Sequence, residues 1–242
     1  MKAELIYHGH SCFEVIGRDR ILIDPFLKDN PLADVVPDEL EPDIIAVTHG
    51  HGDHLGDAVE ISERTGAPVV SIAEIAWYLS GIIGNKAIGM NMGGTAKIKN
   101  TEFTMVRADH SSGLRTEKGQ ISGGQAAGII IDSGFRIYHL GDTALFLDLK
   151  IYRTLFSPQV VLIPIGGYYT MDPKQAALAA GWLEPRVVVP MHYNTWPVIN
   201  QDPEIFREYV KGLLGEKTEV IIPQPGMHID LTTYLKEREE KD

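Results

Sequence analysis

Cysteine and long apolar runs are both scarce in this 242-residue chain. Cys12 is the only cysteine, so an internal disulfide is excluded, and we expect a small buried apolar residue rather than a nucleophile. No stretch reaches the roughly 18 consecutive apolar residues that mark a transmembrane helix. The N-terminal residues begin with strand-like sequence and carry no charged-then-apolar signal. We therefore predict a cytoplasmic protein with no integral membrane segment.

Basic residues are also few, since 22 Lys and Arg stand against 33 Asp and Glu and give a formal net charge of −11. Nucleic-acid binding normally requires a basic face, so we expect no nucleic-acid partner and favour a small-molecule substrate. Bound divalent cations would offset part of the charge. A hydrophobic fraction of 44% suits one globular domain over residues 1–242. We expect the charged tail, residues 236–242, to be solvated.

Strand and helix patterns follow the same order in both halves of the chain: short strands first, then strand–helix units. The first half predicts strands at 4–8, 12–16, 20–24, 43–48, 68–71 and 102–108, with helices at 53–65 and 72–82. The second half predicts strands at 126–132, 135–140, 160–164, 186–190 and 219–222, with helices at 173–183 and 203–214. Ser133-Gly134 is a two-residue turn signal between the first two of these strands. This order predicts an α/β fold, a four-layer αββα sandwich in which loops of both halves meet at one edge.

The segment Thr48-His49-Gly50-His51-Gly52-Asp53-His54 places four potential metal ligands within six residues. A random match to this pattern is expected in below about one chain in a thousand of this composition, which argues against a polar turn with incidental histidines. Imidazole and carboxylate suit Zn²⁺ and its neighbours, and the glycines let the backbone turn tightly. Because Asp53 and His54 begin a predicted helix, their directions can differ from those of His49 and His51, and one cluster can serve two metals.

Three further candidates, His110, Asp142 and His192, each follow a predicted strand. Singly, each is as well explained as a structural residue. Together they occupy equivalent strand ends along one sheet edge, where α/β active sites are built.

With these residues, the sequence resembles the metallo-β-lactamase superfamily over essentially its whole length. Asp24 matches the first of five family motifs, the histidine-rich segment the second, and His110, Asp142 and His192 the remaining three. The resemblance implies two divalent metal ions, Zn²⁺ by preference, with Mn²⁺, Fe²⁺ or Ni²⁺ as alternatives. It implies a first site of His49, His51 and His110, a second of Asp53, His54 and His192, and Asp142 bridging them.

Shorter motifs, including Gly9-His10-Ser11-Cys12-Phe13 and Pro190-Met191-His192-Tyr193-Asn194-Thr195, look like an uncharacterised bacterial and archaeal group of metal-dependent hydrolases. That group is similar to ascorbate-6-phosphate lactonase and N-acylphosphatidylethanolamine phospholipase D. His51 suits a hydrolytic site, whereas similar redox di-iron proteins usually carry an acidic residue at that position. The resemblance therefore implies hydrolysis of an ester-type substrate, a phosphodiester or a lactone, by a hydroxide that bridges the two metals.

Several residues receive roles with an alternative beside each. Asp24 either fixes the tautomer of a ligand histidine or caps the turn before Pro25. His8 and His10 are expected on one side of a strand; His10 either donates a proton or contacts substrate, or is a structural histidine. With Asp142, His10 and Asp24 form the predicted catalytic set, while His139 and His228 are interpreted as packing or exposed residues.

Substrate contacts are predicted from the loops. Tyr168, in the segment 164–171, and Asn194 are candidate substrate-binding residues, although either loop is equally explained as a simple turn. The Gly- and Ser-rich segment 111–124 is interpreted as a lid or as an ordinary hairpin loop. Two other functions stay open, a ribonuclease of the same superfamily and a non-catalytic metal or ligand sensor. Homo-oligomer formation is a further expectation.

Overall fold

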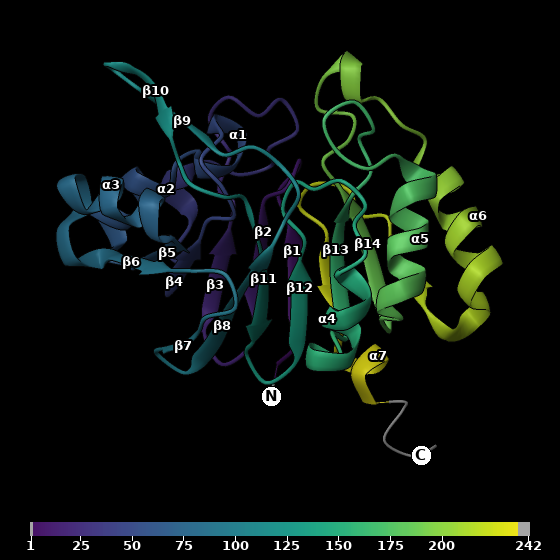
Figure 1. Ribbon diagram of the computed structural model, residues 1–242. Helices are drawn as coiled ribbons and strands as arrows, with labels where there is room; N and C mark the ends of the chain where they lie inside the picture. Colours follow the sequence, from purple (N-terminus) through teal and green to yellow (C-terminus); the bar gives the residue numbers. More distant parts are fainter. Residues whose placement is uncertain (1, 237–242) are drawn as a thin grey trace.

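Two seven-stranded sheets pack face to face in the computed structural model, which describes residues 2–236 (Figure 1). The first sheet has the order β16-β1-β2-β3-β4-β5-β6, and the second has the order β15-β14-β13-β12-β11-β8-β7. In the first, the strands are β1 (Glu4–Tyr7), β2 (Phe13–Ile16), β3 (Arg20–Ile23), β4 (Ile44–Ala46), β5 (Val69–Ile72), β6 (Ala87–Met90) and β16 (His228–Asp230). In the second, they are β7 (Thr95–Ile98), β8 (Thr101–Arg107), β11 (Ala127–Asp132), β12 (Arg136–His139), β13 (Val160–Pro164), β14 (Val187–Met191) and β15 (Glu219–Val220).

Each sheet changes from antiparallel to parallel pairing at its centre. Strands β16, β1, β2 and β3 pair antiparallel, whereas β3 to β6 pair parallel. The second sheet repeats this pattern, antiparallel from β7 to β12 and parallel from β12 to β15. The parallel strands alternate with helices that cover the outer faces, because parallel strands need crossover connections. The helices are α1 (Gly52–Leu55), α2 (Ala58–Thr65), α3 (Ala73–Ile83), α4 (Leu149–Phe156), α5 (Pro173–Leu183), α6 (Pro203–Leu214) and α7 (Thr232–Lys236).

Three apolar clusters separate four layers. The largest lies between the sheets and includes Phe13 from one and Phe103 from the other. A second packs the outer face of the second sheet against α4, α5 and α6, and a third packs the first sheet against α2 and α3. Figure 1 shows the two helical layers on opposite outer faces. The αββα architecture predicted from the sequence is confirmed.

One local prediction is wrong, and for a second segment the structure shows a hairpin, which was one of the two predicted alternatives. The expected helix over 53–65 is two helices, α1 and α2, because Gly56 has a φ of 42° and a Cβ there would lie 2.2 Å from the carbonyl oxygen of Pro25. The segment 111–124 is a two-stranded hairpin, β9 (Gly113–Thr116) and β10 (Gly119–Ser122), that projects beyond the rest of the molecule (Figure 1). Its base is anchored, since Leu114 is buried against the α2–α3 layer.

Within residues 2–236, no helix has both the length and the apolar character needed to span a membrane. Most of the charged tail, residues 237–242, lies outside the described part of the chain.

Candidate metal centre

The histidine-rich segment follows β4, whose apolar residues are fully buried in the first sheet. The chain turns sharply after it, and His51 stands at the N-terminus of α1, its carbonyl oxygen accepting from the backbone N–H of His54 at 3.1 Å. His49 and His51 therefore lie before the helix, while Asp53 and His54 lie within it. One short segment thus presents its ligands from two backbone directions.

The other three candidates follow strands of the second sheet. His110 follows β8, Asp142 follows β12 and His192 follows β14. Gly141 allows the chain to turn immediately before Asp142, since it has a φ of 62° and a Cβ there would lie 2.6 Å from the carbonyl oxygen of Ala127. Both sheets therefore contribute to the same edge.

The structure brings all seven predicted ligands together. Their donor atoms fall into overlapping groups in which all atoms lie within 4.8 Å of one another. The groups are His49, His51 and His110; Asp53, His54 and His192 together with His10; and His49, His54 and Asp142. The first two match the sets implied by the resemblance, apart from the addition of His10.

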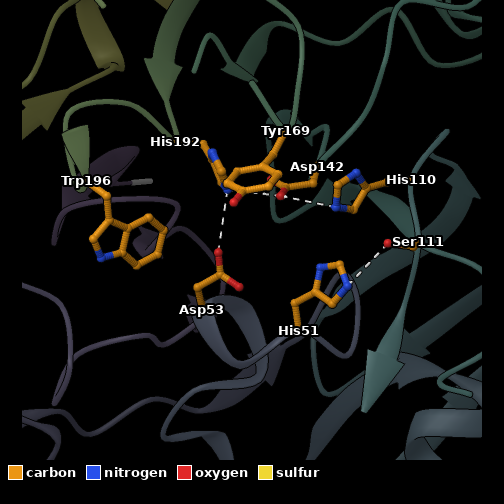
Figure 2. A pocket seen from close by; sticks show the side chains of 8 residues that line it. All are labelled: His51, Asp53, His110, Ser111, Asp142, Tyr169, His192 and Trp196. Atoms are coloured by element: carbon orange, nitrogen blue, oxygen red, sulfur yellow. Dashed lines mark hydrogen bonds and ion pairs between the residues drawn. The ribbon is translucent and has the colours of Figure 1, made fainter. Parts of the chain in front are cut away.

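Asp142 lies between the two groups. Its Oδ1 is 3.3 Å from Nε2 of His54, and its Oδ2 is 3.0 Å from Nε2 of His192 and 3.6 Å from Nε2 of His110. Asp53 lies on the far side, with Oδ2 3.7 Å from Nε2 of His192 (Figure 2). The carboxylate of Asp142 thus faces histidines of both groups, as a bridging ligand would.

Several of these donor atoms are buried and make no hydrogen bond within the described part of the chain. They are Nε2 of His54, Oδ1 of Asp142, and both ring nitrogens of His192. Buried polar atoms normally find a partner, because an unpaired one costs about 1–3 kcal/mol. A divalent cation would satisfy His54, Asp142 and His192 at once, so the residues present fit a metal centre.

Burial and mutual charge shift the ionisation of these groups in the metal-free protein. Burial alone would lower the pKa of His192, but Asp142 and Asp53 outweigh it and raise the pKa to about 9. Burial, reinforced by neighbouring His54, lowers the pKa of His49 well below its usual value. Burial would raise the pKa of Asp142, yet His192 and His54 hold it well below its ordinary value. Asp142 is therefore an anion at neutral pH, suited to a cation.

Asp24 is fully buried directly behind the centre. Its Oδ2 accepts hydrogen bonds from Nδ1 of His54 at 2.7 Å and from the hydroxyl of Thr48 at 2.7 Å. Its Oδ1 accepts from the backbone N–H of Thr48 at 2.8 Å. A proton held on Nδ1 leaves the lone pair of Nε2 in His54 directed at the centre, which is the tautomer that a metal ligand needs.

His10 differs from the expectation in two respects. It does not continue β1 but lies in a turn with a φ of 55°, so it is not part of a strand shared with His8. Its ring is fully buried, with Nδ1 2.7 Å from the hydroxyl of Thr195 and Nε2 3.2 Å from Oδ2 of Asp53. This geometry favours a positioning residue for Asp53 over a proton donor or substrate contact.

The remaining histidines and the cysteine lie outside the ligand set. Nδ1 of His8 is 2.9 Å from Asp34. Nε2 of His139 is 3.0 Å from the carbonyl oxygen of Ser11, where it can donate a hydrogen bond. The side chain of His228 is exposed. Cys12 is buried among apolar residues, and this burial raises the pKa of its thiol, so it is unsuited to nucleophilic chemistry.

A cavity of about 280 Å³ opens over the centre (Figure 2). Five of the predicted ligands line it, together with Ser111 from the segment 111–124, Tyr169 from the segment 164–171, and Trp196, which had no predicted role. Tyr168, the predicted substrate contact, does not line this cavity and is 71% exposed; its neighbour Tyr169 takes that place. Asn194 does not line it either, because its Oδ1 closes a turn by accepting from the backbone N–H of Gln201 at 2.8 Å.

Comparison with known proteins agrees with this geometry. Residues 4–192 match the family model described as the Beta-lactamase superfamily domain. The chain belongs to the metallo-β-lactamase superfamily. A UPF0173 metal-dependent hydrolase of Thermococcus onnurineus is 50% identical to it over 226 residues, which make up 92% of this chain and 97% of that protein. One from Archaeoglobus fulgidus is 48% identical over 225 residues, 92% of this chain and 96% of that protein.

Solved structures give the same assignment. Igni18, a metallo hydrolase from Ignicoccus hospitalis, is 39% identical, with a TM-score of 0.85 over 95% of this chain and 98% of its own. The metallo-β-lactamase fold protein YhfI from Bacillus subtilis is only 11% identical, with a TM-score of 0.71 over 95% of this chain and 99% of its own, which shows a shared fold alone. Together with the sequence relatives, these findings identify a metal-dependent hydrolase of the metallo-β-lactamase superfamily.

Proposed function

We propose that this protein hydrolyses an ester-type substrate at a centre of two divalent metal ions, Zn²⁺ by preference. The observation that carries the proposal is the convergence of seven imidazole and carboxylate side chains, several with unpaired buried donor atoms, at the base of an open cavity. His49, His51 and His110 would hold one ion, and Asp53, His54 and His192 the other, with Asp142 shared. We take residues 1–242 as one hydrolase domain, placed in the cytoplasm.

The surrounding residues position the candidate ligands and shape the cavity. When bound, divalent cations acidify a water molecule and polarise an oxygen of the substrate. Asp24 keeps the proton of His54 on Nδ1, and His10 holds Oδ2 of Asp53 through a bond of 3.2 Å. The cavity wall of Tyr169 and Trp196 limits how a substrate approaches. No side chain is required as a nucleophile.

Metal content and turnover test the proposal in two steps. Purified protein loaded with Zn²⁺ or Mn²⁺ should retain about two equivalents per chain. It should then hydrolyse p-nitrophenyl esters, simple lactones or bis-p-nitrophenyl phosphate, and Asp142→Asn should abolish that activity. Asp19→Asn is the matched control, because Asp19 is a carboxylate of similar burial that bonds only to Asn100 and Thr101 at a distance from the centre.

The alternatives predict other results. Protein that stays near zero metal after loading would remove the basis for the proposal. Two bound equivalents without turnover of any substrate would favour a non-catalytic sensor. RNA cleavage with steep salt dependence would favour the ribonuclease, despite the acidic net charge. Homo-oligomer formation remains a prediction, which the mass in solution would decide.

A further inference from the structure

The walls of the cavity differ on its two sides. Figure 2 shows Trp196 on one side of the centre, His51 and Ser111 across from it, and Tyr169 between them beside His192 and Asp142. Apart from the predicted metal ligands, the lining consists of the rings of Tyr169 and Trp196 and the hydroxyls of Tyr169 and Ser111. No Lys or Arg of the described chain is among the lining residues. A substrate entering here therefore meets the ring of Trp196 on one side and the polar groups of His51 and Ser111 across from it.

Trp196 is held in place before any substrate arrives. Its ring lies edge-on to His10, with ring centroids 5.0 Å apart, and tilted against Phe26 at 6.0 Å. Its carbonyl oxygen accepts from the backbone N–H of Ile199 at 3.0 Å, at the start of the 3₁₀ turn Pro197–Ile199. A wall fixed in this way loses little conformational entropy on binding, so its apolar surface contributes fully to affinity.

Basic side chains outside the lining include two that form ion pairs and one on the projecting hairpin. Arg107 lies 3.7 Å from Asp109 and 3.6 Å from Asp148. Lys28 forms an ion pair with Glu60. Arg115, on the projecting hairpin, is exposed and does not line the cavity. A substrate group carrying its own negative charge, away from the bond to be cleaved, would find no Lys or Arg among the lining residues to replace its lost solvation, which is costly.

We propose that the substrate is a neutral carboxylic ester or lactone whose uncharged, apolar acyl part packs on Trp196, and that Trp196 sets this preference. The inference rests on the proposed hydrolase function. Hydrolysis adds one water across the acyl C–O bond: hydroxyl goes to the acyl carbon, the bond to the alcohol oxygen breaks, and the proton ends on that oxygen. Tyr169, 54% exposed, lines the same cavity.

Two substrates with one leaving group and acyl chains of equal length isolate the charge. They are p-nitrophenyl butyrate and mono-p-nitrophenyl succinate, compared on the metal-loaded full-length protein after subtraction of each ester's spontaneous hydrolysis, which the neighbouring carboxylate accelerates in the succinate. We expect kcat/KM for the butyrate to exceed that for the succinate by at least about tenfold, the discrimination that one unfavourable pocket contact gives. The succinate reacting as fast as the butyrate, or faster, overturns the proposal.

Trp196→Ala tests the residue itself. It should lower kcat/KM for p-nitrophenyl butyrate by about tenfold and change that for p-nitrophenyl acetate far less, because only the longer acyl chain reaches the ring. Trp196→Phe keeps an aromatic wall and should restore most of the loss, which separates a lost wall from a misfolded loop. An unchanged butyrate-to-acetate ratio in Trp196→Ala overturns the role of this residue.

The failure of the substrate class and the failure of the hydrolase proposal give different results. Turnover of bis-p-nitrophenyl phosphate but of no neutral ester or lactone, with loss of that turnover in Asp142→Asn, overturns the neutral class and keeps the hydrolase. No turnover of any substrate by protein that holds two metal equivalents overturns both. Ester hydrolysis that persists in Asp142→Asn is not chemistry of this centre and overturns both as well.

Discussion

Replacing Asp24 with asparagine keeps the shape of the side chain but converts one acceptor oxygen into an amide donor. In the native protein, both oxygens of Asp24 only accept hydrogen bonds, from two groups of Thr48 and from Nδ1 of His54. Asparagine can satisfy these donors in two orientations. With its oxygen toward His54, its NH₂ group faces the backbone N–H of Thr48, which cannot accept. With its NH₂ group toward His54, the proton of His54 must move to Nε2.

The second orientation costs less, because the hydroxyl of Thr48 can rotate to accept and imidazole can exchange tautomers, whereas a backbone N–H has no alternative. In this orientation, Nε2 of His54 carries the proton and directs an N–H at the candidate metal centre, where the native histidine directs a lone pair. Loss of the residue that hydrogen-bonds the other ring nitrogen of a metal-ligating histidine reduces metal affinity by about 10–100-fold. The neutral amide also forms weaker hydrogen bonds to Thr48 and His54 than the carboxylate does, because bonds to a charged acceptor are roughly twice as strong, so folding stability falls.

Competition with a chromophoric chelator measures the affinity, and urea unfolding measures the stability, in Asp24→Asn and in the matched Asp19→Asn protein. Asp19 also accepts three hydrogen bonds, from Asn100 and Thr101. Both variants should lose stability, and only Asp24→Asn should lose metal affinity. If Asp24→Asn binds metal within about twofold of the wild-type protein, Asp24 does not set the tautomer of His54 and the reasoning is refuted.

Two further predictions concern stability. Bound metal would pair buried donor atoms of His54, Asp142 and His192. Free metal at 100 times its Kd should therefore raise the free energy of unfolding by about 2.7 kcal/mol. Chelation should then lower Tm by roughly 5–10 °C in a calorimetric scan; an unchanged Tm in protein known to have been loaded contradicts this. Burial alone would lower the pKa of His8, but hydrogen bonds to Glu14 and Asp34 raise it above its usual value. The stability that His8 contributes is therefore complete below about pH 6.5 and is lost as pH rises through the folded-state pKa. The unfolding free-energy difference between wild-type protein and His8→Gln should shrink with rising pH; a difference that grows contradicts the sign.

The regular elements with clear boundary signals could be predicted from the sequence. Pro173 and Pro203 open α5 and α6 where expected, because proline at the first helical turn loses no hydrogen bond. Ser133-Gly134 joins β11 and β12 as a turn. The short edge strands β6 and β7 and the helix α4 were not predicted. In α4, Leu149, Tyr152 and Phe156 pack on the second sheet's outer cluster, but Ile151 and Leu155 are exposed, so the apolar residues of the sequence do not single out one face.

The candidate metal ligands could be predicted from the sequence, but the residues of the cavity walls could not. Histidine and aspartate at strand ends carry a signal in their type and spacing. Tyr168 and Tyr169 are adjacent in an irregular loop, where no periodicity tells which ring faces the centre; only the fold places Tyr169 there. Trp196 directly follows Thr195, the last residue of a recognised motif, and its contacts with His10 and Phe26 join parts of the chain more than 150 residues apart.

Backbone strain gathers around the centre and argues that the site is shaped before metal arrives. Of the seven non-glycine residues with positive φ among residues 2–236, three belong to it or contact it: His10, Asp24 and His192. Such conformations cost about 1–3 kcal/mol each and persist only where surrounding bonds enforce them. Here the backbone N–H of His192 donates to the carbonyl oxygen of His10 at 2.8 Å, and so ties the second sheet's ligand loop to the first sheet's turn. Because this bond is part of the protein itself, removing the metal should cost stability without separating the two sheets.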